Sequence, residues 1–354
     1  MMSTFIFNKL FYGLLVLLGV VFVIFGLFNI LPVDPARLTL GQRADIESVE
    51  AINKEFGLDK PKYVQLALYL NDLSPIAVHE NTKEAKEKYS YTKLFAVSKE
   101  KALVLKMPYL RRSYQTKENV SEILARTIPT TVLLAITSIL LAIIIGIPLG
   151  VIGALKQHSW FDNIAMSISV LWISAPSFVT AMVLSLYFGY KWHDFTGLEV
   201  SGPLFWINDY GEEVLLLKNL ILPTIALGTR PVAIIYQLTR SSMLDALGYD
   251  YVRTARAKGL SESTIIIKHT LRNALNPVIT SISGWFASLL AGAYFVEIVF
   301  NLDGLGSKTV QSLNTFDFPV VMGSILFAAT VFIIMNFLVD MLYAILDPRI
   351  RIGK

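Results

Sequence analysis

Long apolar runs alternate with polar segments along this chain. A helix needs about 20 mainly apolar residues to cross a hydrocarbon core roughly 30 Å thick. Six runs meet that requirement: Leu10–Leu31, Ile128–Leu155, Ile164–Tyr190, Val214–Leu238, Val278–Phe300 and Val320–Leu346. The pattern predicts an all-α polytopic membrane protein with six transmembrane helices.

Proline and glycine within the third and fourth runs affect the predicted shape of these helices. The third run contains Pro176, and the fourth contains Pro223, Gly228 and Pro231. Membrane helices tolerate such residues because neighbouring helices satisfy the freed backbone groups. We therefore expect the fourth run to form a bent helix packed inside the bundle. The first run exceeds the apolar core of about 7–15 residues of a cleaved signal peptide, so we expect it to be retained.

Polar segments divide the chain into regions. We expect an N-terminal transmembrane helix at 1–31 and an extracytoplasmic region at 32–127. A five-helix transmembrane core follows at 128–346 with a cytoplasmic loop at about 240–277, and the tail is 347–354.

The positions of lysine and arginine predict the orientation, because short cytoplasmic loops carry the excess of these residues. The two short outer loops hold only Lys191 and Lys308, with Lys218 close to one of them. The inner segments hold Lys9, Lys156, Arg240, Arg253, Arg256, Lys258, Lys268, Arg272, Arg349, Arg351 and Lys354. Both termini are therefore expected in the cytoplasm.

Composition agrees with a membrane protein and excludes some chemistry. Only 16% of the residues are charged, against about 25% in soluble domains. The chain has no cysteine and four scattered histidines, so we expect no disulfide, no thiol nucleophile and no metal or cofactor bound by this chain.

The loop segment "DYVRTARAKGLS" (250–261) predicts a short helix. Gly248 is expected to end the preceding helix and Asp250 to cap the next one. That helix should run from Tyr251 to Lys258 and stop at Gly259, where a positive φ costs little. Ser261 is then expected to cap a second helix that ends near Pro277.

Three interpretations of this short helix are open: a solvated basic loop, a nucleic-acid contact, and a docking site for a cytoplasmic protein. Ala255 and Gly259 lie four residues apart, and small side chains at that spacing let another surface approach the backbone. Nucleic acid is disfavoured because the loop is fixed at a membrane and offers few cations to phosphates.

The string "DYVRTARAKGLSESTIIIKHTLRNALNPVIT" resembles the coupling loop of permease subunits of ABC importers. "LPVDPA", "EFGLDKPKYVQLALYL", "RTIPTT", "LTRSSMLDAL", "VEIVFNLDGLGSKTVQSLNTFDFPVV" and "DPRIR" resemble the B-type subunit of the oligopeptide, dipeptide and nickel branch. The family pattern has a glutamate–alanine–alanine triplet before the glycine. Arg253 and Thr254 depart from it, whereas Ala255 and Gly259 match.

This resemblance implies a type I importer permease that forms half of a pathway for oligopeptides. It implies a homologous C-type permease, two cytoplasmic ATPases that bind ATP and Mg, an extracytoplasmic peptide-binding protein, and a bacterial cytoplasmic membrane. The residues expected to couple to the ATPases are Asp250, Tyr251, Ala255, Ala257, Lys258, Gly259 and Leu260.

Other functions stay open at this point. Within the family, the alternative substrates are nickel, dipeptides and glutathione. A secondary transporter or channel, and a membrane-anchored binding protein that works through region 32–127, are the alternatives from other classes of protein.

Residues at about 74–112 resemble an insertion. The family's short "GDLG-x-S" turn is divided here between "NDL" (71–73) and "SYQTKENVSEIL" (113–124). The Lys/Glu-rich part of the intervening stretch is expected to be a helix or a flexible solvated segment.

Two further features need an interpretation. "GLGSKT" (304–309) resembles a phosphate-binding loop, but Ser307 rather than glycine precedes Lys308, so we expect no nucleotide site.

Ionisable residues within membrane helices usually face the protein interior. We expect Arg230 and Asp340 to approach one another as an ion pair. Glu297 is expected either at the outer interface or at an outer gate.

Overall fold

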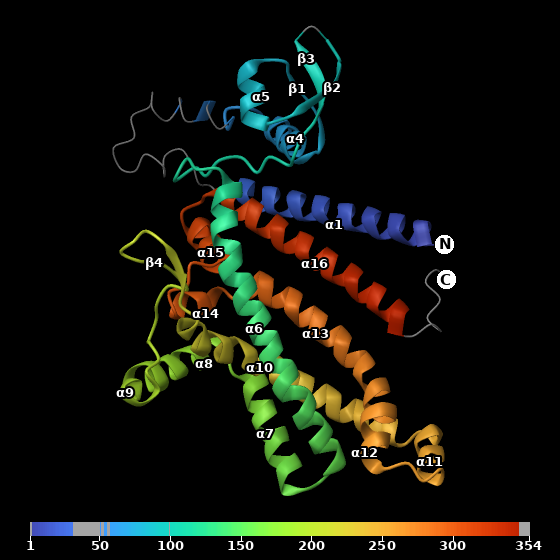
Figure 1. Cartoon of the computed structure of the whole chain (residues 1–354). Helices are drawn as coiled ribbons and strands as arrows, with labels where there is room; N and C mark the ends of the chain where they lie inside the picture. The colour runs from blue at the N-terminus through green and yellow to red at the C-terminus, as the bar shows by residue number, and fades with distance from the viewer. Residues whose placement is uncertain (1, 31–49, 51–52, 55–56, 99, 347–354) are drawn as a thin grey trace. The chain divides into compact units, whose positions relative to one another are not determined.

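The computed structural model describes residues 2–30, 50, 53–54, 57–98 and 100–346. Helices make up most of it (Figure 1). The chain forms two compact units. The core unit comprises 1–14, 127–308 and 328–354, and the peripheral unit comprises 15–126 and 309–327.

Four helices in the described part of the chain are long and apolar enough to cross a membrane. They are α1 (Met2–Ile30, with Phe7–Phe28 as the apolar part), α6 (Val120–Leu155), α10 (Lys218–Leu247) and α16 (Phe318–Leu346). A fifth span results if α7 (Trp160–Ser174) is combined with the segment Ser177–Lys191, which begins with α8 (Ser177–Leu184).

The third predicted run is therefore broken. Its two halves meet at an angle of 106°. Ala175, directly before Pro176, has an extended ψ of 127°. Proline excludes the helical conformation from the residue that precedes it, which explains a break at this point.

The fourth predicted run forms one continuous helix, α10, which extends past Leu238 to Leu247. Its apolar window is 67% buried, more than that of any other candidate span in the described residues, so its place inside the bundle is confirmed. A Cβ at Gly146 or Gly150 of α6 would lie 2.9 or 2.8 Å from a backbone oxygen of α10. Small residues at this spacing let α6 and α10 approach closely.

The fifth predicted run divides at Ala293 into α13 (Arg272–Gly292) and α14 (Tyr294–Val299). α13 carries the hydroxyl side chains of Thr280, Ser281, Ser283 and Ser288. It is not among the described helices that are long and apolar enough to cross a membrane. The sixth predicted run, Val320–Leu346, lies within α16, which begins at Phe318, while the tail 347–354 lies outside the described residues.

Shorter elements connect these helices. They are a π-helical segment (Ser185–Lys191), α9 (His193–Thr196), the hairpin of β4 (Phe205–Ile207) and β5 (Glu213–Leu215), α11 (Asp250–Ala257), α12 (Glu262–Thr264), a second π-helical segment (Ile265–Leu271) and α15 (Leu305–Asn314).

The peripheral unit contains a small α/β module, so the all-α prediction is wrong here. After α4 (Lys62–Leu73) come β1 (Ile76–Glu80), α5 (Lys83–Tyr89), β2 (Thr92–Ala96) and β3 (Lys101–Leu105). The strands form an antiparallel sheet in the order β1-β3-β2. Ala77, Ala102 and Val104 are buried with Tyr91 and pack against Tyr89 at the end of α5.

Backbone hydrogen bonds join the two ends of this module. The Lys106 amide donates to the Pro75 carbonyl, and the Tyr109 amide donates to the Asp72 carbonyl, each at 2.9 Å. The Asp72 carboxylate also accepts from Arg111 Nε at 2.8 Å and from the Tyr89 hydroxyl at 3.2 Å. The chain thus leaves α4 and returns beside it.

In the same unit, α1 packs beside α16 (Figure 1). The rings of Phe25 and Phe28 contact the edge of Phe318, with centroids 6.2 and 5.0 Å apart.

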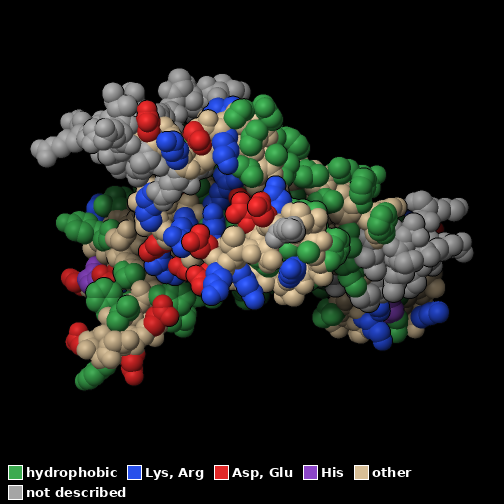
Figure 2. All heavy atoms as spheres, turned by 90° about the horizontal axis from the view of Figure 1, so that it is seen from above, with side chains coloured by type: hydrophobic (Ala, Val, Ile, Leu, Met, Phe, Trp, Pro, Cys, Tyr) green, Lys and Arg blue, Asp and Glu red, His purple; other side chains and the backbone are tan. Residues whose placement is uncertain are grey.

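On the face seen in Figure 2, basic and acidic side chains are interspersed, with hydrophobic side chains grouped beside them. On this face the described residues form no patch of one sign like the basic footprint of a nucleic-acid-binding protein.

Candidate functional site

α11 is the short helix that the sequence predicts, and its boundaries are close to the expected ones. Gly248 caps α10, as predicted. The N-cap is Tyr249 rather than Asp250, which lies in the first turn. Asp250 there makes an ion pair of 3.5 Å with Arg253.

The two faces of α11 differ. Val252 and Ala255 are buried and pack with Ile265, Leu247 and Tyr251. The opposite side exposes Asp250, Arg253, Thr254, Arg256, Ala257, Lys258, Gly259 and Leu260. Ala255 is therefore small because its own chain packs on it, whereas Ala257 and Gly259 are open to a partner.

The end of α11 is a Schellman motif. The Gly259 amide donates to the Arg256 carbonyl at 2.9 Å, and the Leu260 amide donates to the Ala255 carbonyl at 3.4 Å. Gly259 has a φ of +75°, and within the described part of the chain a Cβ added to it would meet nothing within 4 Å. The predicted positive φ is confirmed, and it is what this motif requires.

The segment after Gly259 leads directly into α13. Arg256 Nε and Nη2 donate to Glu262 at 2.9 and 3.3 Å, across the turn. Ser261 is the N-cap of α12, as predicted, although its side chain caps no backbone amide. The predicted helix end near Pro277 is wrong, because this proline lies inside α13. α11 is thus connected to both α10 and α13.

A buried ion pair holds α10 beside the turn that joins α6 to α7. Arg240 donates from Nε and Nη2 to the two carboxylate oxygens of Asp162, each at 2.6 Å. The Asp162 carboxylate also accepts from the His158 amide at 3.0 Å and from the Tyr236 hydroxyl at 3.2 Å. Asp162 is 2% exposed, whereas the Arg240 side chain is 16% exposed, so water reaches the pair only from the arginine side.

The sequence pattern did not predict this pair: Arg240 counted there only as a cytoplasmic cation, and Asp162 had no predicted role. A local signal was available: Ser159 and Asp162 have the spacing of a capping box before an apolar run. The Ser159 hydroxyl indeed accepts from the Asp162 amide at 3.3 Å.

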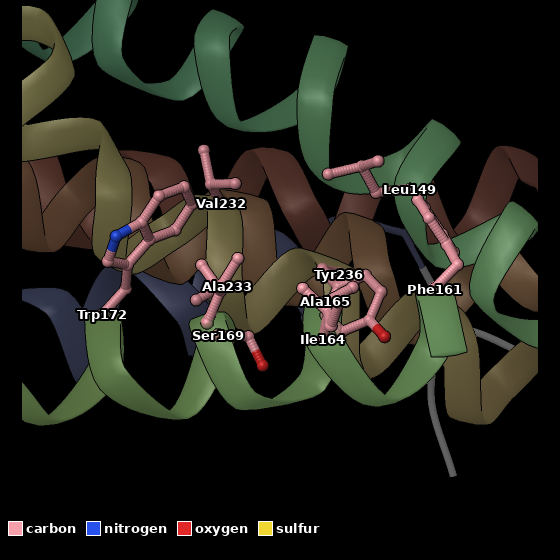
Figure 3. A pocket seen from close by; sticks show the side chains of 10 residues that line it. Leu149, Phe161, Ile164, Ala165, Ser169, Trp172, Val232, Ala233 and Tyr236 are labelled. Atoms are coloured by element: carbon pink, nitrogen blue, oxygen red, sulfur yellow. The ribbon is translucent and has the colours of Figure 1, made fainter. Parts of the chain in front are cut away.

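A cavity of about 200 Å³ lies beside this pair, between α6, α7 and α10 (Figure 3). Its walls are almost wholly apolar, and the polar groups among the lining side chains are the hydroxyls of Ser169 and Tyr236 and the indole N–H of Trp172. The lining residues are Leu149, Phe161, Ile164, Ala165, Ile168, Ser169, Trp172, Val232, Ala233 and Tyr236. Such walls do not offer the polar groups that would fix a charged solute.

Arg230 has a partner in the described structure. Its Nη2 donates to the Ile173 carbonyl at 3.1 Å. Ile173 belongs to the last turn of α7, whose carbonyls lose their intrahelical partners where the chain bends before Pro176. The side chain of Asp340 lies outside the described residues, so its pairing with Arg230 stays a prediction.

Glu297 is completely buried within the protein. Its expected position at the outer interface or at an outer gate stays a prediction. One carboxylate oxygen accepts from the Thr131 hydroxyl at 2.6 Å, and the other accepts from the Ser307 amide at 2.7 Å. Ser307 lies in the first turn of α15, the helix that "GLGSKT" opens. The anion at this helix N-terminus is therefore the chain's own carboxylate.

Similarity to known proteins shows to which protein family the chain belongs. Residues 146–352 match the family model of the binding-protein-dependent transport system inner membrane component. Residues 2–88 match the N-terminal model of such membrane components. The chain belongs to this family. It is a permease subunit of an ABC importer.

The permease is similar to curated relatives over nearly its whole length. It is 35% identical to a putative peptide transport system permease protein of Brucella melitensis, with 99% of each chain covered. It is 36% identical to the glutathione transport system permease protein of Escherichia coli, with 96% of each covered. It is 33% identical to the dipeptide transport system permease protein of Alkalihalophilus pseudofirmus, covering 95% of this chain and 96% of the relative.

A solved structure shares the fold. The inward-facing methionine ABC transporter MetNI matches with a TM-score of 0.50 and 15% identity, covering 64% of this chain and 97% of that chain. The permease is thus a multi-pass membrane protein and the membrane component rather than the ATPase of its system. These matches do not favour a secondary transporter, a channel or an anchored binding protein.

Proposed function

We propose that the permease forms half of a peptide translocation pathway across a bacterial cytoplasmic membrane. A homologous C-type permease completes the pathway, and an extracytoplasmic peptide-binding protein delivers the cargo. Two cytoplasmic ATPases, which bind the ATP and Mg, power the cycle. The substrates in the relatives' names support a peptide: dipeptide, peptide and glutathione share an amide backbone with charged ends.

The exposed face of α13 carries this proposal. Asn273, Thr280, Gly284 and Ser288 are exposed along one side of the helix. A hollow of about 270 Å³ is lined there by Ser281, Gly284, Trp285 and Ser288. A lipid-facing helix surface would be apolar, as it is at the exposed Ile144 of α6. A polar face of this kind fits a water-filled pathway shared with the second permease.

The exposed side of α11 is the proposed ATPase-docking surface. It presents Asp250, Ala257, Lys258, Gly259 and Leu260, with Tyr251 and Ala255 as its internal support. Movement of a docked ATPase would pass through α11 into both α10 and α13. The Arg240–Asp162 pair would carry it on to α7.

The orientation and the number of spans belong to the same proposal. Six spans with both termini in the cytoplasm place α11 on the ATPase side, in agreement with the distribution of lysine and arginine. α7–α8 and α13–α14 then serve as the two broken spans. An Arg230–Asp340 pair inside the membrane also remains part of the proposal.

Single-cysteine labelling tests the pathway, because the chain has no cysteine of its own. In the assembled transporter, Ser281→Cys and Ser288→Cys should react with a membrane-impermeant thiol reagent, while Ile144→Cys on a lipid-facing surface should not. Equal reactivity at all three positions would contradict a polar pathway along α13.

Uptake measurements test the substrate. Proteoliposomes that contain the full complex should take up di- to pentapeptides with ATP, and cargo should protect Ser288→Cys from the reagent. Uptake of nickel without peptide uptake would favour the alternative substrate. Uptake driven by an ion gradient without ATPases would contradict the proposal as a whole.

A further inference from the structure

Glu297 joins three segments that are far apart in the sequence. Its Oε1 accepts from the hydroxyl of Thr131 on α6, and its Oε2 accepts from the Ser307 amide at the start of α15. The Thr131 hydroxyl in turn accepts from the Leu305 amide at 2.7 Å. Glu297 itself lies on α14, so α6, α14 and α15 meet at one carboxylate.

The corner from Phe300 to Ser307, which connects α14 to α15, has no spare volume around this carboxylate. A Cβ at Gly304 would overlap the Glu297 carboxyl group, and a Cβ at Gly306 would lie 2.9 Å from the Tyr294 backbone. The Leu302 amide also donates to the Glu297 carbonyl at 2.8 Å. Side chain and main chain of one residue therefore both hold the corner.

α14 and this corner are packed into the core unit. Val296, Phe300 and Leu302 belong to the same buried cluster as Leu220 and Leu222 of α10. The Phe295 ring contacts Phe178 of α8, with centroids 5.7 Å apart. α13 ends directly before α14, so whatever fixes α14 also fixes one end of α13.

We propose that Glu297 is a positioning residue for transport, which fastens the 300–307 corner to α6 and thereby holds the end of α13 in place. The buried carboxylate is matched to its site because both oxygens accept: one from a hydroxyl and one from an amide at a helix N-terminus, where negative charge is favoured. An amide side chain of the same shape would turn an NH₂ group toward one of these donors. The role in transport rests on the proposed function, whereas the fastening does not.

Two isosteric changes and two matched controls test the proposal in the full complex. Glu297→Gln and Thr131→Val each remove one half of the contact. Thr131→Ser keeps the hydroxyl, and Asp303→Asn neutralises an exposed carboxylate of the same corner. Amide hydrogen exchange at 305–307, measured without cargo, should accelerate about tenfold or more in the first two variants and stay unchanged in the controls.

Uptake of a labelled tripeptide should fall about tenfold in Glu297→Gln and Thr131→Val, while co-purification of the ATPases and basal ATP hydrolysis stay within about twofold. The double variant should be no worse than either single one. Wild-type uptake that fails for all peptides would count against the proposed substrate, and the exchange result would still test the fastening.

A purely structural role predicts a different outcome for Gly304→Ala, which clashes with the Glu297 carboxyl group. Adding Glu297→Ala to it relieves that clash and should restore thermal stability. We expect uptake to stay low in this double variant because the carboxylate is missing. Recovery of uptake together with stability, or normal exchange in Glu297→Gln, would overturn the proposal.

Discussion

Arg240 holds the Asp162 carboxylate through two hydrogen bonds of 2.6 Å, and Asp162 is buried. Arg240 lies about two helical turns before the end of α10 at Leu247, where the chain passes into α11. The ion pair joins the end of α10 to the first turn of α7. Because α11 follows α10 along the chain, we expect a movement of α11 to reach α7 as well as α13.

Removing one partner of this pair should be costly, because the other charge stays buried. We expect Asp162→Asn and Arg240→Ala each to lower the free energy of unfolding by about 3–5 kcal/mol. Tyr236→Phe, which removes one hydroxyl donor to Asp162, should cost only about 1 kcal/mol. Unfolding in mixed micelles measures these changes. If Asp162→Asn and Arg240→Ala combined in one chain cost the sum of the two single variants, the two residues do not stabilise one another.

Substitutions of Gly259 can distinguish two effects: strain in the backbone of the turn, and a collision between the new side chain and a docked partner. Asparagine tolerates a left-handed φ, so Gly259→Asn should fold normally, since no atom of the described residues lies within 4 Å of the added Cβ. Gly259→Val should strain the Schellman turn and destabilise the loop by about 1–2 kcal/mol. If an ATPase packs on this surface, Gly259→Asn should still weaken ATPase co-purification about tenfold or more. Normal ATPase assembly and transport in Gly259→Asn would contradict docking at this position.

The two alanines of α11 should respond in opposite ways. Ala255→Leu overpacks the contact with Val252 and Ile265 and should destabilise the loop by about 1–3 kcal/mol. Ala257→Leu lies on the exposed side, so protein stability should be unchanged while ATPase binding is lost. Thermal unfolding and co-purification, measured on both variants, distinguish the faces. Equal destabilisation by both changes would show that α11 does not present Ala257 to a partner.

The peripheral α/β module should lose stability in acid because of His79. Burial and then the nearby Lys106 charge lower the pKa of His79 below its usual value, Asp72 opposes them, and Lys88 adds to the lowering. The ring stacks on Tyr89 with centroids 3.9 Å apart, and the buried Nε2 accepts no hydrogen bond in the described residues.

The sign follows from proton uptake. The unfolded chain binds a proton near pH 6.5 and the folded module does so only at lower pH, so stability is complete above about pH 6.5 and falls as the pH drops below it. The protection factors of amides 76–105 in the full chain, obtained from hydrogen exchange after correction for the intrinsic pH dependence of the exchange rate, should therefore fall between pH 7.5 and 5.5. His79→Phe should flatten this dependence. An unchanged pH dependence in that variant would assign the effect to other groups.

Several features could be predicted from the residues alone, because each depends on neighbours in the sequence. Apolar runs predict membrane helices wherever the chain must satisfy its backbone in lipid. Gly259 predicted a positive φ, and the motifs around it predicted an ABC importer permease. Where these local rules failed, the failure was also local in origin: Pro176 bent one run, and short strands within a Lys/Glu-rich stretch concealed the β-sheet at 76–105.

Only the tertiary structure could decide which side chains meet. Asp162 lies 78 residues from Arg240 along the chain, and Thr131 lies 166 residues from Glu297. Neither spacing has a period that a pattern could reveal. The same holds for α11: Ala255 and Ala257 are alike in sequence, and Ile265 in the folded loop determines that one is buried and the other faces a partner. Burial and pairing come from the packing of distant segments, so the sequence determined the class of protein and the fold determined its working contacts.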